Sequence, residues 1–190
     1  MGSARLADIT NQITDGVHKT PDYQESGIPF ISTVHVNKEG IDWTRSKFIS
    51  EKEHNELIKR CRPQRGDILY TKVGSVGLAV PVIDDREFSI FVQLALLKPK
   101  DEIVDQQFLT AQLNMPSIFQ RVNSSLSGAT MKYIGVGQIG EICVILPPLS
   151  VQNKFNQLMS MLTRHREGLL DSSKTINLLF SSLQRHVFLR

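Results

Sequence analysis

The chain has 190 residues, enough for one domain with its own hydrophobic core but too few for two ordinary domains. Hydrophobic residues make up 41% and charged residues 22% of the chain, which excludes wholesale disorder and a fibrous fold. The formal net charge is +3, and from Ser150 onward six Lys or Arg residues face two acidic ones. The preceding part is therefore about neutral, so any surface that binds a polyanion must be a local patch.

The sequence contains no run of eighteen apolar residues, and its start lacks the apolar stretch of a secretory signal. We therefore expect a soluble, cytoplasmic protein. The two cysteines, Cys61 and Cys143, have no Cys or His nearby at metal-ligand spacing. Neither a disulfide framework nor a zinc site is predicted, and we expect both thiols to be buried.

The first predicted elements are a strand, a turn and a helix. Residues 27–36 (GIPFISTVHV) are rich in Ile, Val and Phe, which predicts a buried strand, and residues 37–40 then predict a turn. Ser50 and Glu53 have the spacing of a capping box, which predicts a short helix that ends near Cys61.

The middle of the chain predicts more strands. Residues 66–73 and 78–83 have the composition of strands on either side of a tight turn at 74–77, and a further strand is predicted over 89–97.

Two helices and a last apolar run follow. Asp105 is a plausible N-cap for a helix through about residue 114, and a second short helix is predicted over 116–122. Residues 123–128 predict a flexible polar loop. The last apolar run of this part covers 139–146 and ends at a Pro-Pro pair.

The C-terminal segment has a regular period of three and four residues, which is typical of a heptad seam. A helix of about forty residues would be roughly 60 Å long, more than one core can cover, so it needs a partner helix. The alternative, an amphipathic helix on its own domain, is disfavoured because the period outlasts a normal surface helix. The predicted dimerisation residues are Phe155, Leu158, Leu162, His165, Leu169, Ser172, Ile176, Leu179 and Leu183. The polar members would fix the register of the pairing, or are simply tolerated near solvent.

Four stretches of the sequence together resemble the specificity subunits of type I restriction-modification systems. They are residues 13–21 (ITDGVHKTP), residues 27–32 (GIPFIS), residues 66–77 with GDIL and KVGSVG, and residues 127–152 with SGAT, LPPL and Gln152. Each stretch alone is weak evidence for the resemblance, but their order ahead of a heptad helix makes the match specific over nearly the whole chain. The resemblance implies an α+β fold: a mixed α/β target recognition domain at 1–148 and a long spacer helix at 149–190 that forms an antiparallel coiled coil.

Such subunits usually carry two recognition domains and two spacer helices, whereas this chain has one of each. It is then either a fragment of a longer chain or a natural half-length subunit that restores the pair as a homodimer. Two copies paired antiparallel would place a reader at each end of the coil, so that the helix length sets the unread gap in a palindromic, bipartite DNA site. The resemblance also implies methyltransferase and restriction or translocase subunits as partners. S-adenosylmethionine, ATP and Mg²⁺ would belong to those subunits, and we expect no cofactor on this chain.

Residues that contact DNA are expected on loops that carry cations, hydroxyl groups or an aromatic ring. The candidates are His18, Lys19, Thr20, Lys38, Arg45, Lys72, Ser75, Thr130, Lys132 and Tyr133. For Lys72, Ser75, Thr130 and Lys132 the alternative is a solvated loop position, since loops are polar anyway. For His18 and for His35 the alternatives are a cap on a turn and a satisfied place in a strand. Trp43 is expected to pack in the core or a loop rather than to stack on a base.

Three other classes of protein are alternatives to a DNA reader. None of the acidic residues has a Lys two positions later, which disfavours the common metal-dependent nuclease core. The run 146–149 (LPPL) lacks the polar and aromatic members of a DNA methyltransferase motif, and no phosphate-binding glycine loop opens a helix. We therefore expect no catalysis by this chain. The remaining alternative is a protein-interaction adaptor that dimerises through its coiled coil and does not read DNA.

Overall fold

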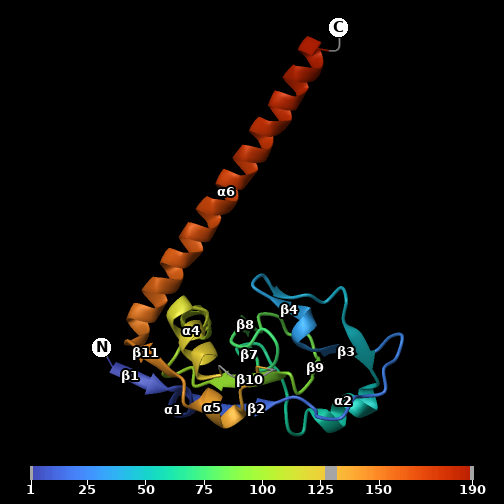
Figure 1. The fold of residues 1–190 in the computed structure, drawn as a ribbon, viewed down its shortest axis with the longest axis vertical. Helices are drawn as coiled ribbons and strands as arrows, with labels where there is room; N and C mark the ends of the chain where they lie inside the picture. The colour runs from blue at the N-terminus through green and yellow to red at the C-terminus, as the bar shows by residue number, and fades with distance from the viewer. Residues whose placement is uncertain (1, 127–131, 189–190) are drawn as a thin grey trace. The chain divides into compact units, whose positions relative to one another are not determined.

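The structure is a computed structural model that describes residues 2–126 and 132–188 (Figure 1). Contacts within the chain divide it into two units, residues 1–152 and residues 153–190. The first unit contains the sheets and the short helices, and most of one long helix makes up the second.

The main sheet of the first unit has four antiparallel strands in the order β2-β10-β7-β8. Its strands are β2 (Thr10–Asp15), β10 (Leu94–Pro99), β7 (Ile68–Thr71) and β8 (Ala79–Pro81). Nearly every residue of β10 and all of β7 are buried, as expected for strands covered on both faces. The predicted strands at 66–73 and 78–83 are confirmed as β7 and β8, which pair directly with each other.

A second sheet consists of β6 (Lys47–Ile49), β3 (Ile28–Ile31) and β9 (Ser89–Ile90). Strand β3 is central, antiparallel to β6 and parallel to β9. The prediction of a single strand over 89–97 is wrong in one respect. The segment forms two strands, β9 and β10, which belong to different sheets, and the chain changes direction between them.

The strand predicted over 27–36 is also shorter than expected. After β3 the chain forms the 3₁₀ helix η1 (Thr33–His35), because Ser32 and His35 cap each other. The amide of Ser32 donates to Nδ1 of His35 at 3.0 Å. The chain then continues as β4 (Val36–Asn37).

Strands β4 and β5 (Gly40–Ile41) form a hairpin, which confirms the predicted turn at 37–40. The side-chain oxygen of Asn37 accepts hydrogen bonds from the amides of Glu39 at 2.8 Å and Gly40 at 3.1 Å. This is the local hydrogen bonding that makes Asn a turn residue.

The short helices begin where their capping residues predict. Helix α2 (Glu51–Leu57) is capped by Ser50, whose Oγ accepts from the amide of Glu53 at 3.1 Å. Helix α3 (Gln106–Leu113) is capped by Asp105.

The remaining helices of the first unit are α1 (Leu6–Ile9), α4 (Pro116–Ser125) and α5 (Val136–Gly140). Helix α4 extends into the predicted loop at 123–128, whose last two residues lie outside the described part of the chain.

The core joins the two sheets. Ile31 of the second sheet and Leu69, Val80 and Leu96 of the main sheet belong to one buried cluster, together with Cys61. Burying a large apolar side chain stabilises the folded state by about 1.5–3 kcal/mol. This cluster is therefore the main stabilising element of the first unit.

Cys143 is exposed, so the prediction that both thiols are buried is wrong for this residue. It lies in β11 (Cys143–Leu146), which pairs with β1 (Gly2–Arg5) in a two-stranded sheet. Val144 points into the core, so its neighbours Cys143 and Ile145 point to solvent, as alternation along a strand requires.

Helix α6 (Leu149–Phe188) begins after the Pro-Pro pair. Its first turn is fixed to the first unit by the buried amide of Gln152. This amide donates to the carbonyls of Pro147 at 2.8 Å and Ile103 at 3.1 Å, and accepts from the amide of Asp105 at 2.8 Å. Within the described chain, no helix has the length and apolar character needed to cross a bilayer.

Candidate nucleic-acid interface

Loops that are far apart in the sequence meet around residues 91–93. The amide of Val92 donates to the carbonyl of Val17 at 3.0 Å, and the amide of Phe91 donates to the carbonyl of Ile31 at 2.9 Å. The turn after β2 and the end of β3 are thereby joined to the segment between β9 and β10.

Two further loops join at Lys72. Its amide donates to the carbonyl of Gln93 at 2.8 Å, and its own carbonyl accepts from the amide of Ile134 at 3.0 Å. We call the assembled surface the loop cluster: residues 16–20, 32–35, 72–75, 91–93 and 132–134. Because backbone hydrogen bonds hold these loops together, their side chains have defined relative positions.

The loop cluster presents the kinds of group that bind nucleic acid. His18, Lys19 and Thr20 are exposed on its first loop, Ser75 on the turn between β7 and β8, and Lys132 on its last segment. Ammonium groups suit phosphate, and hydroxyl groups suit either phosphate or base edges. These predicted contacts remain predictions, but the structure places all five side chains on the surface of the first unit.

Lys72 does not behave as a surface loop residue. Its side chain is 0% exposed, and its ammonium lies 2.5 Å from Oδ2 of Asp15 at the end of β2. This burial corrects the prediction that Lys72 contacts DNA directly. The chain turns inward at Lys72 because its backbone completes the pairing with Gln93 and Ile134.

Two more side chains contact Asp15 on its solvent side. The guanidinium of Arg60 contacts its Oδ1, and Nε2 of His18 lies 3.4 Å from the same oxygen. Burial raises the pKa of Asp15, but the hydrogen bond and charge of Lys72, with help from His18 and Arg60, outweigh it, so the pKa lies below its ordinary value. The carboxylate is therefore charged at neutral pH.

Tyr133 covers the buried ammonium. The Nζ atom of Lys72 lies 5.2 Å from the centroid of the Tyr133 ring, within the range of a cation–π interaction. Tyr133 is itself 50% exposed and pairs with Val73 through an isolated β-bridge. One part of the ring is thus held by the protein while the other is open to solvent.

Gln93 is a candidate that the sequence did not reveal. Its half-buried side chain accepts a hydrogen bond from Thr33 Oγ1 at 3.1 Å, within the loop cluster. A glutamine amide can pair with both major-groove groups of adenine. The only signal in the sequence is a polar residue in the apolar run 89–97, which by its composition predicts one strand.

Arg45 lies at the border of the loop cluster. Its guanidinium pairs with Asp42 at 2.8 Å and lies 3.5 Å from the carbonyl of Val34. Beside it is a hollow of about 360 Å³, lined by residues that include Tyr23, Phe91, Gln93 and Lys47.

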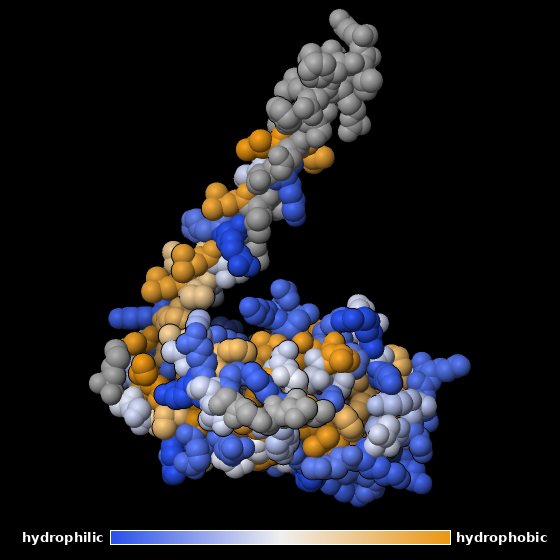
Figure 2. Space-filling model, viewed as in Figure 1, coloured by the Kyte–Doolittle hydropathy of each residue, from blue (hydrophilic) through white to orange (hydrophobic). Residues whose placement is uncertain are grey.

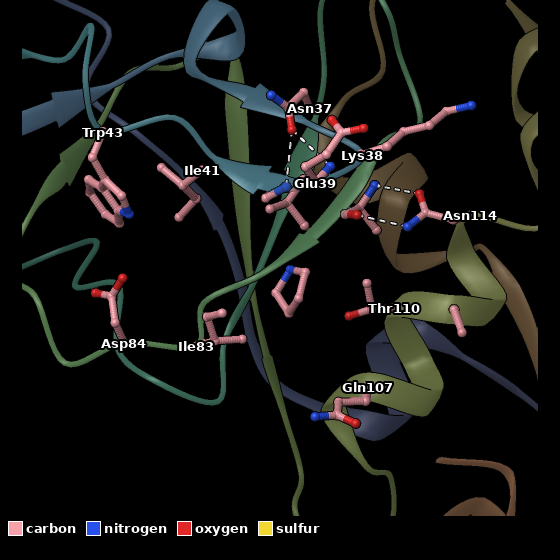
Figure 3. Close-up of a pocket in the computed structure, with 15 residues that line it drawn as sticks. Asn37, Lys38, Glu39, Ile41, Trp43, Ile83, Asp84, Gln107, Thr110 and Asn114 are labelled. Atoms are coloured by element: carbon pink, nitrogen blue, oxygen red, sulfur yellow. Dashed lines mark hydrogen bonds between the residues drawn. The ribbon is translucent and has the colours of Figure 1, made fainter. Parts of the chain in front are cut away.

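Lys38 is separated from the other candidates. It lies on the β4–β5 hairpin at a cavity of about 380 Å³ between this hairpin and α3. Figure 3 shows the lysine side chain at the rim, extended away from the cavity. The Asn114 amide, which also lines this cavity, forms two hydrogen bonds with the backbone of Ala79 and so covers the free edge of β8.

The remaining polar and aromatic candidates have structural roles or lie outside the description. His35 is buried and bonded through both ring nitrogens, to Ser32 and to the carbonyl of Arg45, although it lies in η1 rather than in a strand. Trp43 packs edge-on against Phe88 at 5.2 Å. Thr130 lies outside the described residues. Within the described residues, no group of three or more His, Cys, Asp or Glu side chains is placed to hold a metal ion.

Comparison with known proteins identifies the class of molecule that this arrangement belongs to. The family model for the type I restriction modification DNA specificity domain matches residues 3–174, and the chain therefore belongs to this family. It is 25% identical over 154 residues to the type I restriction enzyme EcoBI specificity subunit of Escherichia coli. That alignment covers 81% of this chain and 32% of the relative.

Solved structures show the same fold. A chain from a study of complex assembly and conformational transition of the type I R-M system has a TM-score of 0.69 and 18% identity, over 98% of this chain and 44% of that chain. The HsdS subunit from Thermoanaerobacter tengcongensis has a TM-score of 0.64 and 18% identity, over 90% and 39% of the two chains. The S subunit from M. genitalium has a TM-score of 0.59 and 17% identity, over 96% and 44%. The chain thus spans 32% to 44% of the length of these relatives, and its first unit has their mixed α/β fold.

Proposed function

We propose that this chain reads one half of a bipartite DNA sequence for a type I restriction-modification enzyme, and that the loop cluster is its reading surface. The observation that carries the proposal is the convergence of several loops, fixed by backbone hydrogen bonds, in a chain of the DNA specificity family. Base readout requires donors and acceptors held in fixed positions, and the loop cluster has that property.

In this proposal the exposed lysines of the cluster contact phosphates and set the register, whereas Gln93, Ser75 and Tyr133 contact bases or sugars. Lys19 and Lys132 provide the charge. The first unit as a whole is about neutral, in agreement with a local rather than an extended contact with the DNA backbone.

Helix α6 supports the proposed scaffold role. Leu158, Leu162, Leu169 and Ile176 of the predicted seam are each more than 60% exposed, and Figure 2 shows apolar side chains along the described part of the helix. Such a row of leucines favours burial against a second helix. We propose that two copies of the chain pair antiparallel through this seam.

The polar seam positions keep their hydrogen bonds inside the helix. Nδ1 of His165 lies 3.0 Å from the carbonyl of Met161, and Ser172 Oγ donates to the carbonyl of Gly168 at 2.9 Å. They can therefore enter a coiled coil without leaving a buried donor unpaired. The side chains of Leu179 and Leu183 lie outside the described set.

In this proposal the chain is not a catalyst. Methyltransferase subunits that bind S-adenosylmethionine would flank it, and restriction subunits that use ATP and Mg²⁺ would join them. The chain itself would bind no cofactor and would supply only sequence choice and spacing.

The test is a selection from a pool of duplexes with a randomised segment, using the full chain with and without methyltransferase subunits. We expect enrichment of a motif with two specified parts, related by a two-fold axis and separated by an unspecified gap. Genome-wide mapping of methylated bases, with and without the gene, should show loss of the same motif. A chain that dimerises but enriches no sequence, even with its partners, would instead be an interaction adaptor.

A further inference from the structure

The fully buried Lys72 is the most unusual charged group in the first unit. An ammonium removed from water is costly unless an anion compensates it, and Asp15 does so at 2.5 Å. A lysine that served only as packing could be replaced by an apolar residue at little cost. Its presence calls for a role that needs the charge or the geometry that the charge imposes.

The geometry of Lys72 links three parts of the loop cluster. Its backbone joins Gln93 to Ile134, and its side chain reaches back to Asp15, next to the turn that carries His18. The same ammonium lies under the ring of Tyr133. Lys72 therefore fixes the segment of Gln93, the ring of Tyr133 and the turn that carries His18 relative to one another.

We propose that Lys72 and Asp15 form a buried positioning pair for DNA recognition, which holds the exposed ring of Tyr133 and the segment of Gln93 in the arrangement that distinguishes one base sequence from another. Lys72 touches no DNA in this scheme. The inference rests on the proposed function, because it assigns a role within the DNA-reading surface.

Asp15 keeps a second, exposed cationic partner in Arg60, and the His18 ring also contacts it, but Lys72 has only one anion among the described side chains. Removal of the lysine charge leaves Asp15 paired with Arg60 and His18. Removal of the aspartate charge leaves an ammonium buried without an anion, which is strongly destabilising. The variant to test is therefore Lys72→Met, which removes the charge with little change in length, rather than Asp15→Asn.

The experiment measures the affinity of the full chain, assembled with its methyltransferase subunits, for two duplexes over a range of salt concentrations. One duplex carries the motif that the wild-type chain enriches from the randomised pool, and the other has a scrambled sequence of the same length. For Lys72→Met we expect the preference for the enriched duplex to fall at least tenfold, while the slope of log K against log salt stays unchanged. Lys132→Met is the matched control: loss of an exposed cation should weaken both duplexes similarly and reduce the slope by about 0.9 per copy, or about 1.8 for the proposed dimer.

The outcomes separate the possible roles. A slope reduced by about 0.9 per copy in Lys72→Met would show a phosphate contact, and an unchanged preference in a folded variant would show a merely structural pair; either result overturns the proposal. Tyr133→Leu provides a second variant at an exposed position, and it should lose preference without a change in slope even if Lys72→Met fails to fold. If Tyr133→Leu keeps the wild-type preference, the proposal is wrong. A wild-type chain that prefers neither duplex would overturn the proposed function itself.

Discussion

Gly16 lies where the end of β2 crosses the segment between β9 and β10, and we expect Gly16→Ala to disrupt the loop cluster. A Cβ atom at this position would lie 2.0 Å from the carbonyl oxygen of Ile90 and 2.4 Å from its carbonyl carbon. The two backbones must therefore separate by about 1 Å before even a close contact near 3.0 Å is reached. Backbone atoms cannot move aside as the end of a flexible side chain can.

The separation would break the hydrogen bonds that hold this crossing. The amide of Gly16 donates to the carbonyl of Leu94 at 3.2 Å, and the amide of Val17 donates to the carbonyl of Ile90 at 3.0 Å. Each broken hydrogen bond between buried backbone groups costs about 1–3 kcal/mol, so two broken bonds predict a loss of about 3 kcal/mol in the free energy of unfolding. That is a large part of the 5–15 kcal/mol that stabilises a typical domain.

Urea unfolding followed by the fluorescence of Trp43 measures this loss. Trp43 is the only tryptophan and packs against Phe88 of the core, so its emission reports on the first unit. The control is Gly137→Ala in α5, where a Cβ atom meets nothing within 4 Å and the better helix propensity of Ala predicts a gain of up to about 1 kcal/mol. A Gly16→Ala variant within about 0.5 kcal/mol of wild type would show that the described close approach is incorrect.

Three further predictions concern single residues of the first unit. A thiol reagent should modify exposed Cys143 quickly in the native protein, whereas Cys61, whose pKa is raised to about 12 by burial, should react only on unfolding; two fast thiols would contradict the fold. Burial lowers the pKa of His54 below 6.5, so the unfolded state binds more protons in the window beneath that value. The free energy of unfolding should therefore fall as pH drops through about 6.5, by at most about 1.4 kcal/mol per pH unit, and His54→Gln should remove this contribution in urea titrations at pH 7.5 and 5.5. Ser50→Ala should lower the unfolding free energy by about 1 kcal/mol through loss of the cap on α2, and an unchanged urea midpoint would refute that role.

Features that depend on a few neighbouring residues were predictable from the sequence. The cap at Ser50, the turn at Asn37 and the strands β7 and β8 follow from local hydrogen bonds and local patterns of apolar residues. Burial of Lys72 was not predictable, because its partner Asp15 lies 57 positions earlier in the chain. Gln93 was missed for a related reason: only the separation of β9 and β10 into different sheets places it in a loop.

The charge of the loop cluster limits how the proposed reader can achieve affinity. With Lys72 buried against Asp15, the lysines exposed on the cluster are Lys19 and Lys132 among the described residues. Two phosphate contacts per reader predict a salt slope of only about 1.8, much shallower than that of proteins that neutralise many phosphates. Weak attraction to the DNA backbone leaves base contacts to supply most of the discrimination, and those contacts depend on fixed geometry. A second reader is then needed for affinity, because each half-site alone would be bound weakly and linking two of them raises the effective concentration of the second. A measured slope well above 4 for the dimer would mean that cations outside the loop cluster contact DNA, and the reading surface would have to be placed elsewhere.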